Sequence, residues 1–94
     1  MKLKSVPGNY VGVIFEVTTL QEYRDYRNSK TGYFLIIDSA NPYMIHPVDD
    51  NHQREDTFKE KVVDNQRKYG QYFYSKDLNA LKDWSDASTC YRIL

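Results

Sequence analysis

The stretch MIHPVDDNHQ, residues 44–53, is the part of this sequence whose residue types could do chemistry. Two histidines, His46 and His52, stand on either side of the adjacent carboxylates Asp49 and Asp50. Imidazole and carboxylate groups bind zinc and related metals, and they also act as general acids and bases. These four residues are therefore the candidate metal or acid–base site of the chain.

The spacing of these residues is poor for a compact site. Paired metal ligands commonly lie two residues apart on a strand or four apart on a helix, so that they share one face, and the two histidines do neither. Asp49 and Asp50 have a simpler role ahead of a helical turn, where a carboxylate accepts hydrogen bonds from free N–H groups and favours the helix dipole. We therefore expect no metal and no cofactor, and keep His46, Asp49, Asp50 and His52 as an alternative small metal-dependent hydrolase site.

Nucleophilic and phosphate-binding motifs are missing from the sequence. The lone Cys90 falls in an expected strand, where a small buried residue fits. Ser39, Ser75 and Ser88 fall in expected turns, without the Gly-x-Ser-x-Gly pattern of a nucleophile elbow. The four glycines are isolated, and neither a Walker A nor a Gly-x-Gly-x-x-Gly motif occurs. We expect no enzyme.

The stretch RKYGQYFYSK, residues 67–76, mixes cations with aromatic rings. Proteins that bind single-stranded nucleic acid use such mixtures to stack bases and to hold phosphates. The consensus of the aromatic strand on RNA-binding sheets is not met, because the second glycine and the apolar position are missing. The alternative function is thus a binder of nucleotides or single-stranded nucleic acid. It would use Arg67, Lys68, Tyr72, Tyr74 and Lys76.

The net charge of the chain disfavours a general role in coating nucleic acid. Thirteen basic residues balance thirteen acidic ones, for a formal net charge of zero, so the chain lacks the positive footprint of a protein that binds the phosphate backbone. The charge is uneven, since residues 32–57 carry one basic and five acidic side chains. The acidic segment 49–56 in this region is a candidate docking surface that would steer a basic partner.

The first half of the chain predicts three strands and a helix. NYVGVIFEV, residues 9–17, is rich in β-branched and aromatic residues and predicts a strand, with a bulge or close approach at Gly12. Thr19 and Glu22 form a capping box that begins a helix over 20–28. The continuous apolar run 33–38 is typical of a central strand, and 43–48 predicts a strand antiparallel to it.

The second half predicts two helices and two strands. Thr57 and Glu60 repeat the capping-box spacing, and we expect this helix to end with Gly70 as its C-cap. A short strand follows over 71–75. Ser75 or Asp77 then caps a third helix, whose Leu78, Leu81 and Trp84 face inward, and 89–94 predicts the last strand.

The expected fold is a single α+β domain over residues 1–94, in the order β-α-β-β-α-β-α-β. About five mostly antiparallel strands form one sheet, with two to three helices packed mainly on one face. One cysteine permits no internal disulfide, and neither a signal peptide nor a membrane-spanning stretch is evident, so we expect a cytoplasmic protein with no membrane partner.

Tyrosine is the unusual component, with nine residues against one tryptophan and four phenylalanines. Its amphipathic ring is common on binding surfaces and at hot spots. In size, tyrosine content and lack of catalytic motifs, the chain resembles the small accessory and inhibitor proteins of phages and mobile elements, including anti-defence factors.

The function expected first is thus a non-enzymatic inhibitor that occludes a surface of another protein. Charge reversal at its acidic loop should weaken this binding without unfolding the chain. A homodimer is also expected to be accessible, through pairing of edge strand 43–48 or 89–94 across a two-fold axis. The expected binding residues are Tyr43, Asp49, Asp50, Glu55, Asp56, Tyr72 and Tyr74.

Overall fold

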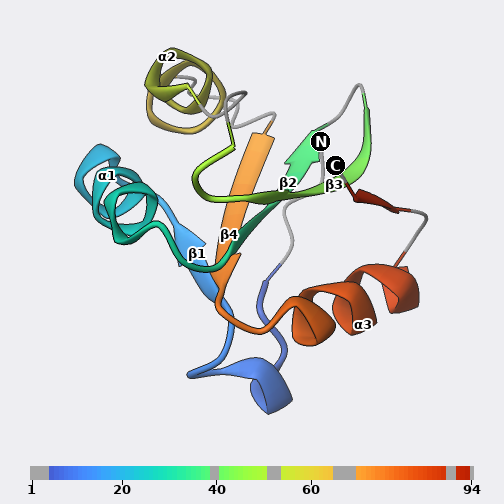
Figure 1. Ribbon diagram of the computed structural model, residues 1–94. Coiled ribbons are helices and arrows are strands. Elements are labelled where there is room, and N and C mark those ends of the chain that lie inside the picture. The colour runs from blue at the N-terminus through green and yellow to red at the C-terminus, as the bar shows by residue number, and fades with distance from the viewer. Residues whose placement is uncertain (1–4, 39–40, 51–53, 65–69, 89–90, 94) are drawn as a thin grey trace.

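The chain folds into one sheet with helices on both sides (Figure 1). The computed structural model describes residues 5–38, 41–50, 54–64, 70–88 and 91–93. In chain order the elements are η1 (Gly8–Tyr10), β1 (Phe15–Val17), α1 (Leu20–Ser29), β2 (Tyr33–Asp38), β3 (Asn41–Pro47), α2 (Glu55–Phe58), η2 (Lys59–Val63), β4 (Gly70–Ser75), α3 (Leu78–Ser88) and β5 (Tyr91–Ile93). The prediction of a small, mostly antiparallel α+β domain is confirmed.

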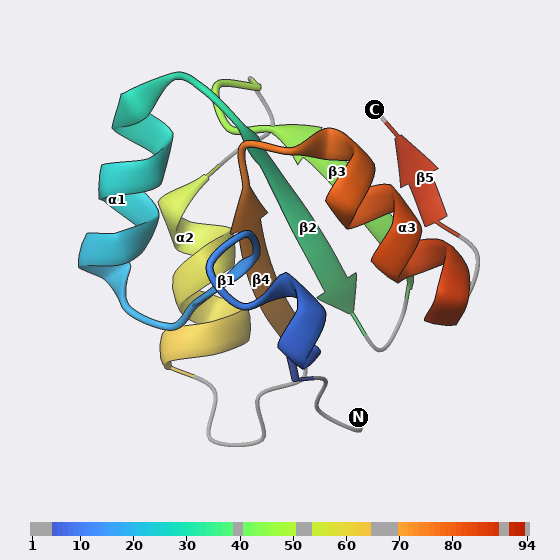
Figure 2. The same ribbon diagram turned by 90° about the horizontal axis from the view of Figure 1, so that it is seen from below.

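The strands of the sheet lie in the order β1-β4-β2-β3-β5. The first four form an antiparallel unit, and the three-residue β5 joins β3 in parallel at the end away from β1 (Figure 2). The central place of strand 33–38 is confirmed, because β2 pairs with β4 on one side and with β3 on the other. Its predicted antiparallel pairing with the following strand is also confirmed.

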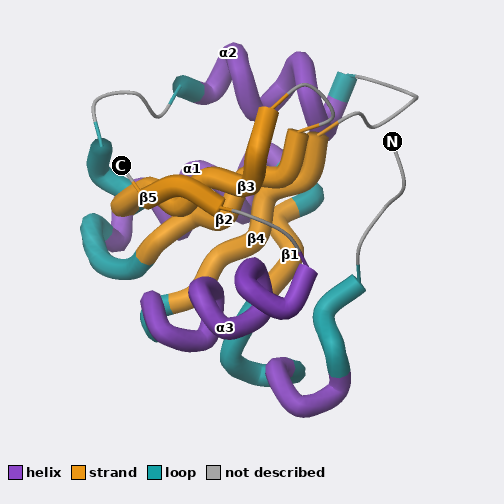
Figure 3. The backbone as a smooth tube through the Cα atoms, turned by 90° about the vertical axis from the view of Figure 1, so that its right-hand side faces the viewer, coloured by secondary structure: helices purple, strands orange, loops and turns teal. Residues whose placement is uncertain are grey.

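Helices cover both faces of the sheet, so the prediction that they pack mainly on one face is wrong. In Figure 3, α2 lies on one side of the sheet and α3 on the other. Leu35 and Phe73 pack with the α3 residues Leu81 and Trp84. The reason lies in β2 and β4 themselves: both strands are apolar on both faces, and a strand of that kind needs cover on both.

The opposite face of the sheet holds a second core. Phe34, Tyr72 and Tyr74 point to this side and pack with Tyr23 of α1 and Phe58 of α2. Because side chains alternate along a strand, neighbouring residues of β4 serve different cores. This alternation places Tyr72 and Tyr74 under α1 and α2, and Phe73 under α3.

Local capping signals set the beginnings of two helices as predicted. The backbone N–H of Glu22 donates to Thr19 Oγ1 at 3.1 Å, and Glu22 Oε1 accepts from the backbone N–H of Thr19 at 3.1 Å. Asp77 Oδ1 accepts from the backbone N–H groups of Asn79 at 3.0 Å and Ala80 at 3.3 Å. Both arrangements satisfy donors that the first helical turn leaves free.

The first strand is shorter than predicted. Only Phe15–Val17 is a strand, and Gly8–Tyr10 is a 3₁₀ turn. Gly12 is not in a bulge: it takes a φ of 87° in the turn between the two elements, a conformation that favours glycine. The turn folds Ile14 into the α3 side of the core.

The second predicted helix begins and ends elsewhere. It begins at Glu55, so Thr57 lies inside it and is not its cap, and it continues as a π-helix over Lys59–Val63. Residues 65–69 lie outside the described part of the chain. Gly70 is the first residue of β4 and not a C-cap. A Cβ at Gly70 would lie 2.8 Å from Lys61 Cβ, so this glycine permits the close approach of η2 to the sheet.

Candidate functional site

The residues of MIHPVDDNHQ do not converge in the part of the chain that is described. His46 lies in β3 opposite Phe34 and is 5% exposed. Asp49 is exposed in a turn in which the N–H of Asp50 donates to the carbonyl of Pro47 at 3.2 Å. His52 lies outside the described residues. No group of three His, Cys, Asp or Glu residues that could hold a metal occurs among the described residues, so the hydrolase alternative gains no support.

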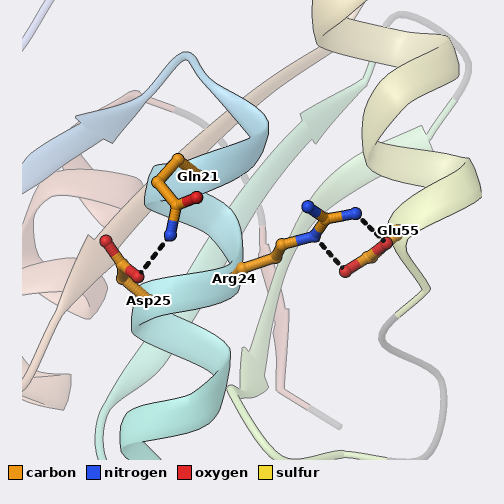
Figure 4. Close-up of polar contacts among 4 residues, drawn as sticks. All are labelled: Gln21, Arg24, Asp25 and Glu55. Carbon is orange, nitrogen blue, oxygen red and sulfur yellow. Dashed lines mark hydrogen bonds and ion pairs between the residues drawn. The ribbon is translucent and has the colours of Figure 1, made fainter.

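Glu55 of the acidic segment binds a cation within the same molecule. Its carboxylate receives two hydrogen bonds from Arg24, from Nε to Oε1 at 2.7 Å and from Nη2 to Oε2 at 3.2 Å (Figure 4). The hydrogen bond from Arg24 holds the pKa of Glu55 below its ordinary value. The neighbouring Asp25 is held by Gln21, whose Nε2 donates to Asp25 Oδ1 at 2.8 Å. The Arg24–Glu55 pair therefore joins α1 to α2.

Asp49 also faces basic residues of its own chain. It lines a surface hollow of about 280 Å³ together with Arg27, Asn28 and Lys30, at the end of α1. Asp49 and Glu55 of the acidic segment thus lie near basic residues at α1, where their charges are partly offset. This placement weakens the segment as a steering surface for a basic partner. Asp56 is exposed on α2, and a docking role for it and for Asp49 and Asp50 stays a prediction.

Tyr72 and Tyr74 are buried, each only 3% exposed. The expectation that these rings form an exposed binding face is therefore wrong. Tyr74 stacks on Tyr26 of α1 with ring centroids 3.9 Å apart, and its hydroxyl donates to the carbonyl of Thr31 at 2.9 Å. Tyr72 meets Phe58 of α2 edge to face at 5.1 Å. The side chain of Tyr43, the third expected tyrosine, lies outside the described part.

The same burial removes the aromatic platform of the nucleic-acid alternative. A stacking surface needs open rings, and the rings of Tyr72 and Tyr74 lie beneath α1 and α2. Arg67 and Lys68 lie outside the described residues, and Lys76 is exposed. Nothing in the described part brings a cation and an open ring of this segment together.

The edges of the sheet are β1 and β5. Strand 43–48 was expected to lie at an edge, and this expectation is wrong, because β5 pairs with β3, with Tyr43 opposite Tyr91. Strand 89–94 does lie at an edge, as residues 91–93. The other edge, β1, is the strand that sequence reasoning did not consider for binding.

An exposed apolar surface adjoins β1. Val11, Val13 and Phe15 are 71%, 38% and 43% exposed, and we call these three residues the edge patch. In the described part of the chain, Val63 on η2 is the other large apolar residue with such exposure. The period-two spacing of the patch along the sequence is the signal that could have drawn attention to it.

A hollow of about 320 Å³ opens beside the edge patch. Val13 and Phe15 line it, and so do Lys76 and Asp77, which are exposed and directly follow β4. Gly12, Tyr74 and Ser75 complete the lining. The arrangement can receive an apolar side chain, because the exposed valine and phenylalanine that line part of the hollow would shed water on binding.

Comparison with known proteins identifies no relative: no family model, no curated protein and no solved structure matches this chain. The described helices include none that is long and apolar enough to cross a membrane.

Proposed function

We propose that this protein is a non-enzymatic binding protein that occludes a surface of another protein, in the manner of an inhibitor or accessory factor, and that it docks through the edge patch. The observation that carries the proposal is the exposure of Val11, Val13 and Phe15 within five residues of an edge strand and the turn before it, with Val13 and Phe15 lining one hollow. Apolar side chains gathered in one exposed place are typical of interaction sites, whereas single exposed ones are ordinary.

The free energy that burial of the edge patch would contribute to binding can be estimated. Full burial of a valine or phenylalanine side chain stabilises a complex by roughly 1.5–3 kcal/mol. Val13 and Phe15 already bury more than half of their surface, so the three residues together would contribute on the order of 3 kcal/mol. A micromolar complex needs about 8 kcal/mol. The edge patch would therefore act together with other groups of the same edge.

The test compares variants of the edge patch with matched controls elsewhere. Val11→Lys combined with Phe15→Lys should abolish the partner complex, because both changes place a charge in the contact. Val63 is a similarly exposed apolar residue on η2, so Val63→Lys should leave the complex intact. Asp49→Lys combined with Asp50→Lys should also leave it intact. The readout is native mass spectrometry of each tagged protein recovered from a lysate of its own host cell.

Two results would contradict this assignment. A complex that survives in the Val11 and Phe15 variant would exclude the edge patch as the docking site. A complex lost only in the Asp49 and Asp50 variant would return the site to the acidic segment. Circular dichroism of each variant checks that the fold is retained, as expected for substitutions at exposed positions.

A further inference from the structure

β1 has one free long side in the described sheet. It pairs with β4 through Phe15↔Tyr74, Glu16↔Phe73 and Val17↔Tyr72, and it ends the strand order. The outer side of an edge strand presents backbone N–H and C=O groups to a further strand. Extended segments of other proteins bind such edges by adding a strand, with main-chain hydrogen bonds giving affinity and side-chain pockets giving specificity.

The side chains of β1 give this edge a definite pattern. Phe15 points to the same face as Tyr74, its partner across the strands, and lies at the hollow. Glu16 points to the other face, beside Phe73, and is exposed; its Oε2 accepts from Gln71 Nε2 at 3.3 Å. A strand added to β1 would therefore meet the hollow beside Phe15 at one position and a carboxylate at the next.

A second copy of the chain fits this edge poorly. In an antiparallel pair related by a two-fold axis, the register that pairs all three residues of β1 places Glu16 opposite Glu16 of the other copy. Like charges directly opposite each other across a strand pair are destabilising. The edge is therefore better matched by a strand that carries the opposite charge at this position.

From this pattern we infer that β1 binds an extended segment of a partner protein with a lysine or arginine opposite Glu16 and apolar residues on either side of that cation. The apolar residue next to the cation enters the hollow beside Phe15. Lys76 and Asp77 carry opposite charges at the hollow, so Glu16 sets the sign of the preferred charge. This inference rests on the proposed function and names the kind of segment that the edge patch receives.

The test uses three synthetic peptides, Ser-Thr-Val-X-Val-Thr-Ser, with lysine, threonine or glutamate at X. Each is titrated into the isotope-labelled protein and followed by amide chemical shifts, which also locate the contact at residues 15–17. The lysine peptide should bind about five- to tenfold more tightly than the glutamate peptide, as expected for exchanging an attractive for a repulsive cross-strand pair. Glu16→Lys should reverse this order, and Glu16→Gln should remove it.

Several outcomes would overturn the inference. Equal affinity for the three peptides, or a preference that Glu16→Lys does not change, would exclude charge recognition at Glu16. No binding together with a concentration-dependent dimer would assign the edge to a second copy. No binding by any peptide would reject strand addition. The proposed function is tested separately in each case, because it depends on whether the edge-patch variant loses the complex formed in the host lysate.

Discussion

Gly32 lies directly against the ring of Tyr74: a Cβ at Gly32 would be 2.7 Å from Tyr74 Cε1 and from its hydroxyl oxygen. The same glycine has a φ of 98°, a conformation that other residues rarely adopt. The ring is held in place, because its hydroxyl donates to the carbonyl of Thr31 and its face stacks on Tyr26. The turn between α1 and β2 and the packing of β4 therefore depend on each other.

Gly32→Ala should destabilise the protein by roughly 2–4 kcal/mol, because backbone strain and a steric clash add at one position. Gly8→Ala is the control: a Cβ there would meet nothing within 4 Å, and Gly8 has no positive φ. Denaturant unfolding of both variants measures the difference. Equal unfolding midpoints would show that the turn can shift away from the ring at little cost.

Two buried tyrosines differ in what their hydroxyl groups contact. Tyr74 donates to Thr31, whereas the buried hydroxyl of Tyr23 has no hydrogen-bond partner within the described ranges. Burial also raises the pKa of Tyr23, since the ionised form would be poorly solvated. Tyr23→Phe should thus leave stability unchanged or raise it, while Tyr74→Phe should lower it by about 1 kcal/mol. Thermal unfolding of both variants checks this, and a larger loss for Tyr23→Phe would contradict it.

Glu22 links the stability of α1 to pH. Burial disfavours its ionised form, but hydrogen bonds from Thr18 and Thr19 outweigh this effect and hold the pKa below its ordinary value of 4.5. A pKa that is lower in the folded state adds stability above the unfolded value, and this contribution is lost as the pH falls through the folded value. Wild-type protein should therefore lose more stability than Glu22→Gln between about pH 6 and about pH 3.

The measurement for Glu22 is urea unfolding of both proteins across that pH range. The wild type carries every other acidic group that the variant carries, so the difference between the two curves reports on Glu22 alone. Thr18→Val removes the hydrogen bond from Thr18 Oγ1 to Glu22 Oε1, found at 3.1 Å, and should give an intermediate curve. Parallel curves for wild type and Glu22→Gln would show that the capping box carries no pH dependence.

Local signals in the sequence predicted the elements that depend on neighbouring residues. The Thr19 and Glu22 capping box works because both partners lie within one turn. The same spacing at Thr57 and Glu60 failed, because the helix begins earlier, at Glu55, which Arg24 of α1 contacts across 31 positions. A contact of that range has no local signature.

The burial of the candidate binding residues is decided by parts of the chain that are distant in sequence. Tyr72 and Tyr74 alternate with Phe73 as residues of a two-sided strand do, but only the placement of α1 and α2 decides that their rings are covered. Which strands form the edges is also a property of the whole sheet: β5 pairs with β3, and among the described strands β1 pairs with β4 alone. The edge patch could therefore be found only after the strand order was known.

Site-specific photo-crosslinking in the host cell shows which residues of this protein touch its partner. A photo-reactive amino acid is placed at Phe15 or Val13 and, as controls outside the edge patch, at Asp56 on α2 or Val63 on η2. Docking through the edge patch predicts one protein adduct from positions 13 and 15 and none from the two controls. An adduct from position 56 or 63, with none from positions 13 and 15, would exclude the edge patch as the docking surface.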